Sequence, residues 1–467
     1  MTLNSTYSKP FLTVPKQIER LEARGMDCGN VVVAYEALEK YGYYRLSGYW
    51  HPYRKFPVPP EPTEDDKGRE IRLEDFENGT TFSKIVDIYM FDQELRAKLG
   101  QVLSAIEVAF RFFVGHRMGK LDPFIHRKPE LFGNATLNED GDYSPSSSYS
   151  KWLAEFDRQE RRAKSSFVQH FREKYGEHLP LWVATEVMSF GALSQFYNLM
   201  PLADRRILAD RLQISRPHNS GKFVGEVEVL SNWLNGFRHA RNLCSHYSRI
   251  WNRVYDVTLS APGAATEERH HVLGKLADKH VNNRLYGLLL ALRYALLSIA
   301  PNDSQVLEIV RYLSTKCSAL GLKLSDAGFP SDWQENEIRS ETYSLIEAPM
   351  LAGSLLDRVE MASASEIRKL LDPEKYYPSN YSAEKRIRIN NAREMLRAYK
   401  RYGVVIGCEL GDTTYYPVFQ FVDGAIRPEV ADINLKLRNR CQESDDLRIT
   451  ASLIEWWLIE NPPTSTP

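Results

Sequence analysis

The stretch NWLNGFRHARNLCSHYSRIWNR, residues Asn232–Arg253, holds four arginines and two histidines in 22 residues and contains no aspartate or glutamate. The whole chain of 467 residues has a formal net charge of −1, so this stretch is a local concentration of positive charge. It contains Arg241, Asn242 and His246 in the spacing Arg-Asn-x-x-x-His. Positive charge gathered in one segment favours an anionic ligand at that segment.

Apolar spacing predicts that this stretch is part of an amphipathic helix. On a straight helix, Arg241 and His246 would lie about 7.5 Å apart along the axis and on different faces, so Arg241 would have to curl round to meet His246 at one phosphodiester. The apolar stripe consists of Val227, Leu230, Leu234, Phe237 and Cys244. Arg241 has the helical spacing of the same stripe, between Phe237 and Cys244. If the helix continues, a second and polar stripe shares one face: Asn235, His239, Asn242, His246, Arg249 and Arg253.

These residue types suit RNA cleavage without a metal. The ribose 2′-hydroxyl attacks its own phosphate, and a histidine, whose unperturbed pKa is about 6.5, can move the proton at neutral pH. An arginine stabilises the charge on the phosphoryl oxygens through paired hydrogen bonds. Arg241 and His246 are therefore the candidate catalytic residues, with Asn242 as support, and we expect no metal and no cofactor. In the alternative, the same residues only grip a structured RNA.

The segment RNLCSHYSRIWNR resembles the active-site segment of the HEPN superfamily of helical RNases. More narrowly, about 300 N-terminal residues resemble the AbiD/AbiF abortive-infection proteins of bacteria, in family order. The further matching segments are KPFLTVPKQIERLEARGM (Lys9–Met26), YGYYRLSGYW (Tyr41–Trp50), FSKIVDIYMFDQELRAKLGQVLSAIEVAFR (Phe82–Arg111) and LPLWVATEVMSFGALSQFY (Leu179–Tyr197).

The resemblance implies a helical fold, RNase toxicity during phage infection and control by a small structured RNA. It also implies that Arg241 and His246 are catalytic and that Asn242 is their polar neighbour. Two Arg/His sets usually meet across a dimer in HEPN enzymes. Because one chain holds one such set, we expect either a homodimer or a monomer held inactive.

Helical periodicity recurs along the chain, so the predicted fold is mainly α: a HEPN-type helical bundle with an N-terminal helical appendage, and a smaller, mostly helical C-terminal domain with a short β-hairpin. The predicted divisions are 1–80 (N-terminal helical region), 81–325 (nuclease domain) and 335–467 (C-terminal regulatory domain). The predicted helices include Val31–Tyr41, Phe82–Arg117, Trp152–Tyr175, Leu179–Leu199, Val281–Ala300, Asp303–Leu320, Thr342–Glu360, Ser363–Leu371, Glu384–Arg401, Pro428–Arg440 and Leu447–Ile459.

Several basic residues are candidates for binding RNA rather than for cleaving it. Arg45 lies in the aromatic run YYRLSGYW, which either stacks bases or plugs the helical core. Arg393 and Arg397 lie in the basic segment Glu384–Arg401, which is either an RNA-binding face or a solvated helix face. The candidates on and after the central helix are Arg238, His239, Arg249 and Arg253.

The C-terminal region resembles the toxin-binding domain of Xre/MbcA/ParS-type antitoxins. The matching features are YPVFQF (Tyr416–Phe421), the Asp423-Gly424 pair, the ADINLKL segment and the tryptophan-rich segment before Asn461. Such antitoxin domains usually accompany another toxin family. Two roles therefore stay open: the domain restrains the nuclease domain, or it is a sensor or RNA-binding module.

Composition points to a cytoplasmic protein without a membrane anchor. The five cysteines are scattered and form no metal-ligand spacing, which is typical of a reducing compartment. The N-terminus lacks an apolar signal core, and the most apolar segment, around Tyr286–Ala300, is too short and carries Arg293. It is predicted to be a buried core helix.

Overall fold

The computed structural model describes the chain from residue 10 to residue 434 with gaps. The described ranges are 10–65, 70–137, 143–212, 214–217, 223–263, 268–300, 303–333, 361–372, 391–402, 404–405, 407–410, 413–427, 430–431 and 434.

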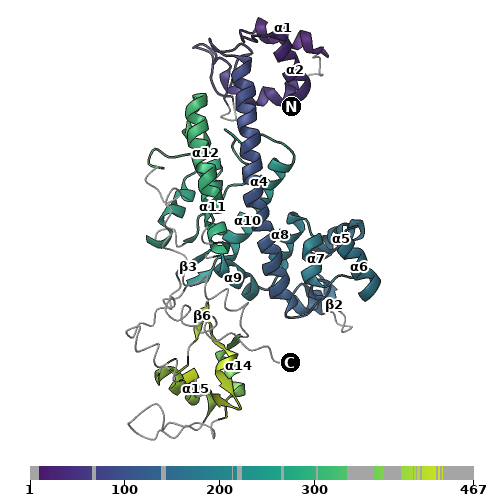
Figure 1. The fold of residues 1–467 in the computed structure, drawn as a ribbon, viewed down its shortest axis with the longest axis vertical. Helices are drawn as coiled ribbons and strands as arrows, with labels where there is room; N and C mark the ends of the chain where they lie inside the picture. The colour runs from purple at the N-terminus through teal and green to yellow at the C-terminus, as the bar shows by residue number, and fades with distance from the viewer. Residues whose placement is uncertain are drawn as a thin grey trace. The chain divides into compact units, whose positions relative to one another are not determined.

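Helices dominate the described residues, and the strands are short and pair antiparallel (Figure 1). The prediction of a mainly helical protein with a short β-hairpin is therefore confirmed. The chain divides into two compact units. The first comprises Met1–Gln101, Ala240–Val254 and Leu307–Phe329, and the second comprises Val102–His239, Tyr255–Val306 and Pro330–Pro467.

The first unit gathers the N-terminal helices with two later segments of the chain. In helix α2 the Asn30 side chain accepts hydrogen bonds from the backbone N–H groups of Val32 and Val33, and Gly42, with φ 82°, follows the last residue. The elements are α1 (Val14–Ala23), α2 (Val31–Tyr41), α3 (Tyr43–Trp50), η1 (His51–Tyr53), the start of α4 (Phe82–Gly119), the end of α10 (Val227–Ser245), most of α12 (Gln305–Leu320) and η6 (Leu324–Ala327).

Helix α4 is the longest described helix, at 38 residues, and agrees closely with the helix predicted for Phe82–Arg117. Its apolar stripe is buried as the spacing predicted: Ile85, Ile88, Leu95, Leu99, Val102, Ile106, Phe110 and Phe113. The boundary between the two units falls within this helix, after Gln101.

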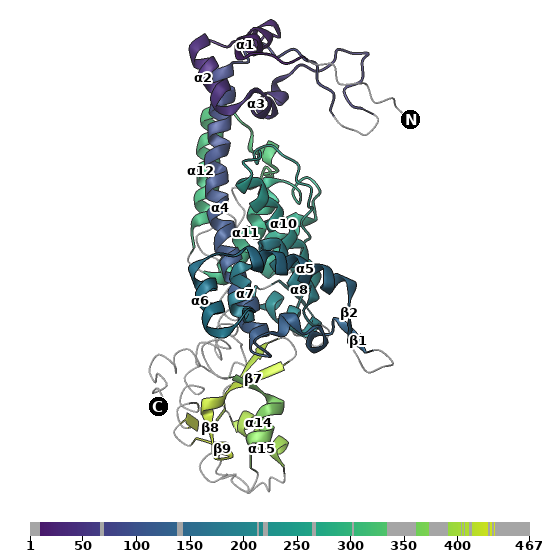
Figure 2. The same ribbon diagram turned by 90° about the vertical axis from the view of Figure 1, so that its right-hand side faces the viewer.

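Within the first unit, α12 lies beside the N-terminal half of α4 (Figures 1 and 2). The Tyr312 hydroxyl donates to the backbone oxygen of Phe91 at 3.0 Å, and the two rings stack with centroids 5.6 Å apart. Trp251, from the segment after α10, packs edge-on against Phe91 at 5.2 Å. Three segments far apart in the sequence therefore meet at Phe91.

The second unit contains a helical part built round α11, which is buried from Leu285 to Ser298. The predicted core helix is therefore confirmed. The elements of this part are the end of α4, η2 (Ile125–Arg127), η3 (Pro129–Phe132), β1 (Ala135–Leu137), β2 (Tyr143–Pro145), α5 (Ser147–Arg162), α6 (Ser166–Tyr175), α7 (Leu181–Val187), α8 (Phe190–Leu199), α9 (Leu202–Arg211), β3 (Ser215–Pro217), β4 (Phe223–Gly225), the start of α10, η5 (Glu268–Ala277) and α11 (Leu285–Ile299).

Two predicted helices are each observed as two shorter ones. The helix predicted for Trp152–Tyr175 ends at Arg162 and restarts at Ser166, because Ala163 and Ser165 have extended backbones. The helix predicted for Leu179–Leu199 breaks at Ser189, whose hydroxyl caps α8 by accepting the N–H of Ala192. Apolar spacing continues across both breaks, so periodicity alone did not reveal them.

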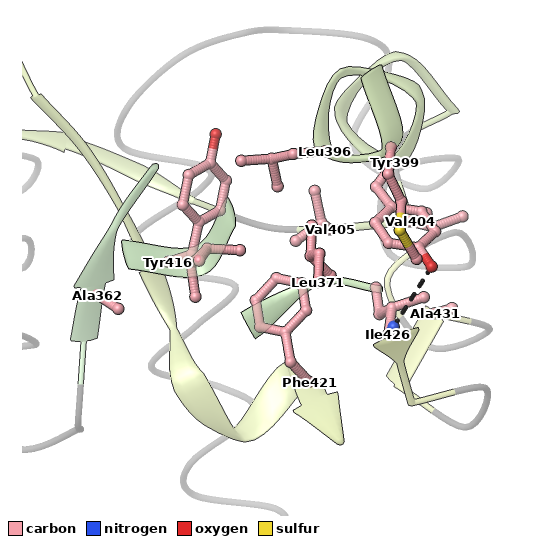
Figure 3. Packing of buried hydrophobic residues seen from close by; sticks show 12 residues of the cluster. Ala362, Leu371, Leu396, Tyr399, Val404, Val405, Tyr416, Phe421, Ile426 and Ala431 are labelled. Atoms are coloured by element: carbon pink, nitrogen blue, oxygen red, sulfur yellow. Dashed lines mark hydrogen bonds between the residues drawn. The ribbon is translucent and has the colours of Figure 1, made fainter. Parts of the chain in front are cut away.

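The described C-terminal residues form a small core of their own (Figure 3). Strand β7 (Thr413–Pro417) pairs with β5 (Met361–Ser363) on one side and with β6 (Cys408–Leu410) on the other. Tyr416 and Phe421 pack with buried residues of α14 (Ala364–Leu370) and α15 (Ala392–Tyr402). The predicted hairpin is thus present as β6–β7, and β5 adds a strand that the sequence did not predict.

A second, tight hairpin follows in the same core. Strands β8 (Phe421–Val422) and β9 (Ala425–Ile426) are joined by Asp423 and Gly424, both with positive φ, at 48° and 85°. Asp-Gly with two positive φ values is the sequence that a two-residue type I′ turn favours. The short 3₁₀ turn η10 (Val418–Gln420) leads into it.

Several predictions lie wholly or partly outside the described residues. They are the helices Thr342–Glu360 and Leu447–Ile459, nearly all of Pro428–Arg440, and the part of Glu384–Arg401 before Asn391. Among the described residues, no helix combines the length and the apolar character that crossing a membrane requires.

Candidate active site

Helix α10 ends at Ser245, directly before His246. The N–H of Tyr247 bonds to the carbonyl of Cys244 and the N–H of Ser248 to that of Leu243, while Tyr247 takes φ 56°. This is the Schellman arrangement, in which a left-handed residue follows the helix cap. The condition for one shared polar stripe, that the helix continues to Arg253, is therefore not met: Arg249 and Arg253 do not extend the polar stripe of α10.

The three motif residues lie at this helix end. Arg241 and Asn242 are half-buried in the last turns of α10, and His246 is the exposed cap residue. The backbone N–H of His246 donates to the carbonyl of Asn242 at 2.9 Å. His246 therefore has a backbone held by the helix and a side chain open to solvent.

The segment after His246 is fastened to helix α3 on one side. The Arg45 guanidinium donates to the backbone oxygen of Tyr247 at 2.8 Å, and the Arg249 guanidinium donates to the backbone oxygen of Gly48. Both arginines were predicted to bind RNA, and both have an intramolecular partner in the structure. Arg45 is exposed, whereas burial lowers the pKa of the half-buried Arg249. RNA binding by either residue stays a prediction.

The same segment is fastened to α4 by Asp92, which is fully buried. Its carboxylate accepts hydrogen bonds from the backbone N–H of Ile250 at 3.2 Å and of Trp251 at 2.8 Å. It also accepts the Tyr49 hydroxyl at 2.6 Å and pairs with the Arg96 guanidinium. Burial raises the pKa of the Asp92 carboxyl, while Arg96 and the hydrogen-bond donors oppose that shift by favouring the charged form.

The aromatic run around Arg45 is a helix, α3, rather than an open platform. Tyr49 and Trp50 are buried, and Trp50 packs edge-on against Tyr43 and Phe76. Tyr44, in contrast, is 91% exposed. Most of the run therefore plugs the core of the first unit, and Tyr44 is the ring left available for stacking.

Three further basic candidates lie on α10 or in the segment that follows it. Arg238 donates to Asn235 at 2.6 Å, and His239 lies 3.5 Å from the carboxylate of Asp256, all within the second unit. Arg253 is half-buried in the segment after α10. Arg45 and Arg249 thus join α3 to the segment that follows His246.

Arg393 and Arg397 lie one turn apart on α15, and both are exposed. The opposite face of α15 places Met395, Leu396 and Tyr399 in the C-terminal core. The predicted basic face therefore points away from that core.

A thiol nucleophile finds little support at this site. Burial raises the pKa of the Cys244 thiol to about 12, so this cysteine is not a thiolate nucleophile at neutral pH. Over the described ranges, no three His, Cys, Asp or Glu side chains form a group that could hold a metal ion.

Residues 36–252 match the family model described as Abi-like protein. This match supports a bacterial abortive-infection protein. The Abi-like segment spans Arg45, the whole of α4 and α10, and His246, and it stops one residue before Arg253. Searches of curated proteins and of solved structures gave no significant match to the chain.

Asp92 is the residue of the Abi-like segment that sequence reasoning missed. Its position carried a signal, because Ile88, Asp92 and Leu95 continue the apolar stripe of α4 at steps of four and three. An aspartate on a core-facing stripe must find hydrogen-bond donors inside the protein. What the spacing could not show is which donors those are.

Proposed function

We propose that this chain is a metal-independent endoribonuclease of HEPN type that acts in abortive infection. The observation that carries the proposal is the position of His246. Its imidazole is exposed at the end of α10 while its backbone is fixed, and Arg241 lies five residues before it on the same helix. The match of residues 36–252 to the Abi-like family supports the biological role.

In the proposed reaction, the ribose 2′-oxygen forms a bond to the adjacent phosphorus and the bond from phosphorus to the 5′-oxygen breaks. His246 moves a proton, either from the attacking 2′-hydroxyl or to the departing 5′-oxygen. Arg241 stabilises the phosphoryl oxygens. The products are a 2′,3′-cyclic phosphate and a 5′-hydroxyl, with no metal required.

One experiment tests catalysis by this pair directly. The wild type, Arg241→Ala and His246→Ala are expressed without neighbouring genes, and growth and total-RNA integrity are followed. Purified proteins are then incubated with RNA in EDTA, and cyclic-phosphate ends are measured. We expect cleavage by the wild type and a loss of at least about 100-fold in each variant. His170→Ala, which changes an exposed histidine on α6, is the matched control.

The alternative is a protein that binds structured RNA through the same helix without cutting it. In that case the wild type retains RNA on purification, and all variants leave cellular RNA intact. Equal RNA ends from the wild type and His246→Ala would contradict catalysis by His246 and favour the binding protein.

We further propose that a bound RNA or the C-terminal domain controls the activity. The exposed basic face of α15 supports an RNA contact, because Arg393 and Arg397 have no role in the small core behind them. Reversing both charges (Arg393→Glu with Arg397→Glu) should weaken RNA retention at least about tenfold and make it less sensitive to salt. The control is Lys16→Glu with Lys40→Glu, which makes the same charge change at exposed positions of α1 and α2. Equal RNA retention by both double variants would contradict an RNA contact by α15. The remaining explanation would then be that the C-terminal domain restrains the nuclease activity.

The single Arg/His set per chain gives the proposal an oligomeric consequence. We expect the active form to be a homodimer, with the monomer inactive. Sedimentation velocity measured alongside RNA cleavage tests this. Full activity at concentrations where the protein is monomeric would contradict it.

A further inference from the structure

The Asp92 carboxylate lies where it can control the backbone that carries His246. It holds the N–H groups of Ile250 and Trp251, four and five residues beyond the histidine. We propose that Asp92 is a positioning residue, which fixes the direction of the His246 imidazole by anchoring the segment behind it. The inference rests on the proposed ribonuclease function for its effect on catalysis, but the anchoring itself can be measured without RNA.

The direction in which a side chain leaves the backbone depends on the two peptide planes beside it. For His246, α10 holds the first plane through the hydrogen bond to Asn242. The second plane leads into Tyr247, whose positive φ reverses the chain and whose carbonyl is held by Arg45. A reversal of this kind keeps its geometry only if the chain beyond it is also held.

Asp92 supplies that hold from within the core. Ile250 is fully buried and Trp251 is 3% exposed, so both side chains secure the peptides whose N–H groups reach the carboxylate. Asp92 is itself 0% exposed, which removes water as a competing partner. Hydrogen bonds in such surroundings are stronger than in water.

The Arg96 guanidinium and the Tyr49 hydroxyl hold the carboxylate in turn. The Tyr49 hydroxyl lies 2.6 Å from one carboxylate oxygen, and Arg96 reaches both Tyr49 and Asp92. Arg96 also approaches the carbonyl of Ser248 at 3.5 Å, a longer and weaker contact. Tyr49 on α3 and Arg96 on α4 therefore fix the orientation of the Asp92 carboxylate. The carboxylate in turn fixes the backbone of the segment after His246.

The test compares Asp92→Asn with Glu107→Gln. Buried Glu107 and half-buried Arg111 form a second pair on α4, also four residues apart, with 2.6 Å between their charged atoms, and the substitution is equally conservative. Amide hydrogen exchange is measured by mass spectrometry on peptides covering residues 246–254. The ring signal of His246 is recorded by NMR with labelled histidine. RNA cleavage is measured as kcat and KM.

For Asp92→Asn we expect exchange at residues 247–251 to rise at least about tenfold and the His246 signal to shift or broaden, while the signal of His170 stays unchanged. We expect kcat to fall about tenfold to 100-fold with KM little changed, because the imidazole is misdirected rather than removed. Glu107→Gln should leave all of these quantities close to those of the wild type.

Two results would overturn the inference. One is an unchanged His246 signal in Asp92→Asn despite faster exchange at residues 247–251. The other is faster exchange spread evenly over the first unit, which would indicate a merely structural core pair. If the wild type cleaves no RNA, the proposed function fails by itself, and the exchange and NMR results still decide whether Asp92 positions His246.

Discussion

Asp92 and His126 are both 0% exposed, yet the protein treats these two buried polar groups in opposite ways. Asp92, in the first unit, has four hydrogen-bond donors: Tyr49, Arg96 and the backbone N–H groups of Ile250 and Trp251. His126, in the second unit, has no hydrogen-bond partner for either ring nitrogen within the described part of the chain, and its ring packs edge-on against Phe156.

The difference shows how charge is kept or given up inside a protein. A buried carboxylate can stay charged where a cation and several N–H and O–H donors surround it. A buried imidazole in apolar surroundings gives up its proton instead. Burial, assisted by Arg127 and His178, lowers the pKa of His126 to about 3, so the ring is neutral at neutral pH. The hydrogen bonds of Asp92 join α4 to the segment after α10. The ring of His126 contributes by packing against Phe156 in the core.

Removing the Asp92 carboxylate should have the largest effect on stability. Asp92→Ala leaves Arg96 buried without its carboxylate partner and two N–H groups without their acceptor. We expect a loss of about 3–5 kcal/mol in the free energy of unfolding of the first unit. Urea unfolding followed by tryptophan fluorescence measures it, because Trp50 and Trp251 are buried in that unit and contribute to the signal. A loss below about 1 kcal/mol would mean that the network contributes little.

Lowering the pH should destabilise the protein through His126. Because the pKa of His126 is lower in the folded protein than in the unfolded chain, its contribution to stability is complete above about pH 6.5 and is lost progressively as the pH falls towards 3. The expected loss from this residue is about 2 kcal/mol at pH 5.

The variant His126→Leu isolates this contribution. Leucine is similar in volume and cannot be protonated, so the variant should lose less stability than the wild type between pH 7 and pH 5. His170→Leu, at an exposed position, serves as the control. Parallel pH profiles for the wild type and His126→Leu would show that His126 is not protonated on unfolding in this range.

Tyr49→Phe measures how much one of the donors around Asp92 contributes to stability. Tyr49→Phe keeps the buried ring and removes one hydroxyl that Asp92 accepts and Arg96 contacts. We expect a loss of about 1.5 kcal/mol, as is usual for one hydrogen bond to a charged group. Denaturant unfolding checks the value. If the loss equals that of Asp92→Ala, the hydroxyl rather than the carboxylate is the centre of the network.

An exposed ion pair should give the smallest change in the free energy of unfolding. Lys16 and Glu19 lie 2.7 Å apart on α1, and their side chains are 62% and 59% exposed. Lys16→Ala should change the free energy of unfolding by no more than about 0.5 kcal/mol. A larger effect, resolved in the same unfolding assay, would show that exposure is a poor guide to these energies here.

The sequence predicted helix positions well where a single residue or an apolar stripe determines where the helix begins and ends. Helix α2 was predicted at Val31–Tyr41, ended by Gly42, and is observed with the same bounds. The end of α10 was not foreseen, because the left-handed residue that stops it is Tyr247 rather than glycine. The local sequence therefore left open whether the helix continues to Arg253.

The candidate site was predictable as a motif but not as a structure. The spacing of Arg241, Asn242 and His246 could be read directly, and the Abi-like match covers all three residues. The partners of Asp92 could not be read, since its contacts reach residues that lie 158 and 159 positions away in the chain. Periodicity indicates which face of a helix is buried, and only the folded chain shows what meets that face.

The left-handed backbone of Tyr247 also bears on how selection would act at this position. An aromatic residue with positive φ is strained by about 1–2 kcal/mol relative to glycine, and its ring is 65% exposed and contributes little to the core. In a library of all substitutions at position 247, sorting for stability alone should enrich glycine and asparagine. Sorting for survival of phage infection should instead keep an aromatic residue if that ring touches the substrate. The two enrichment profiles would separate the requirements of folding from those of the reaction at a single residue.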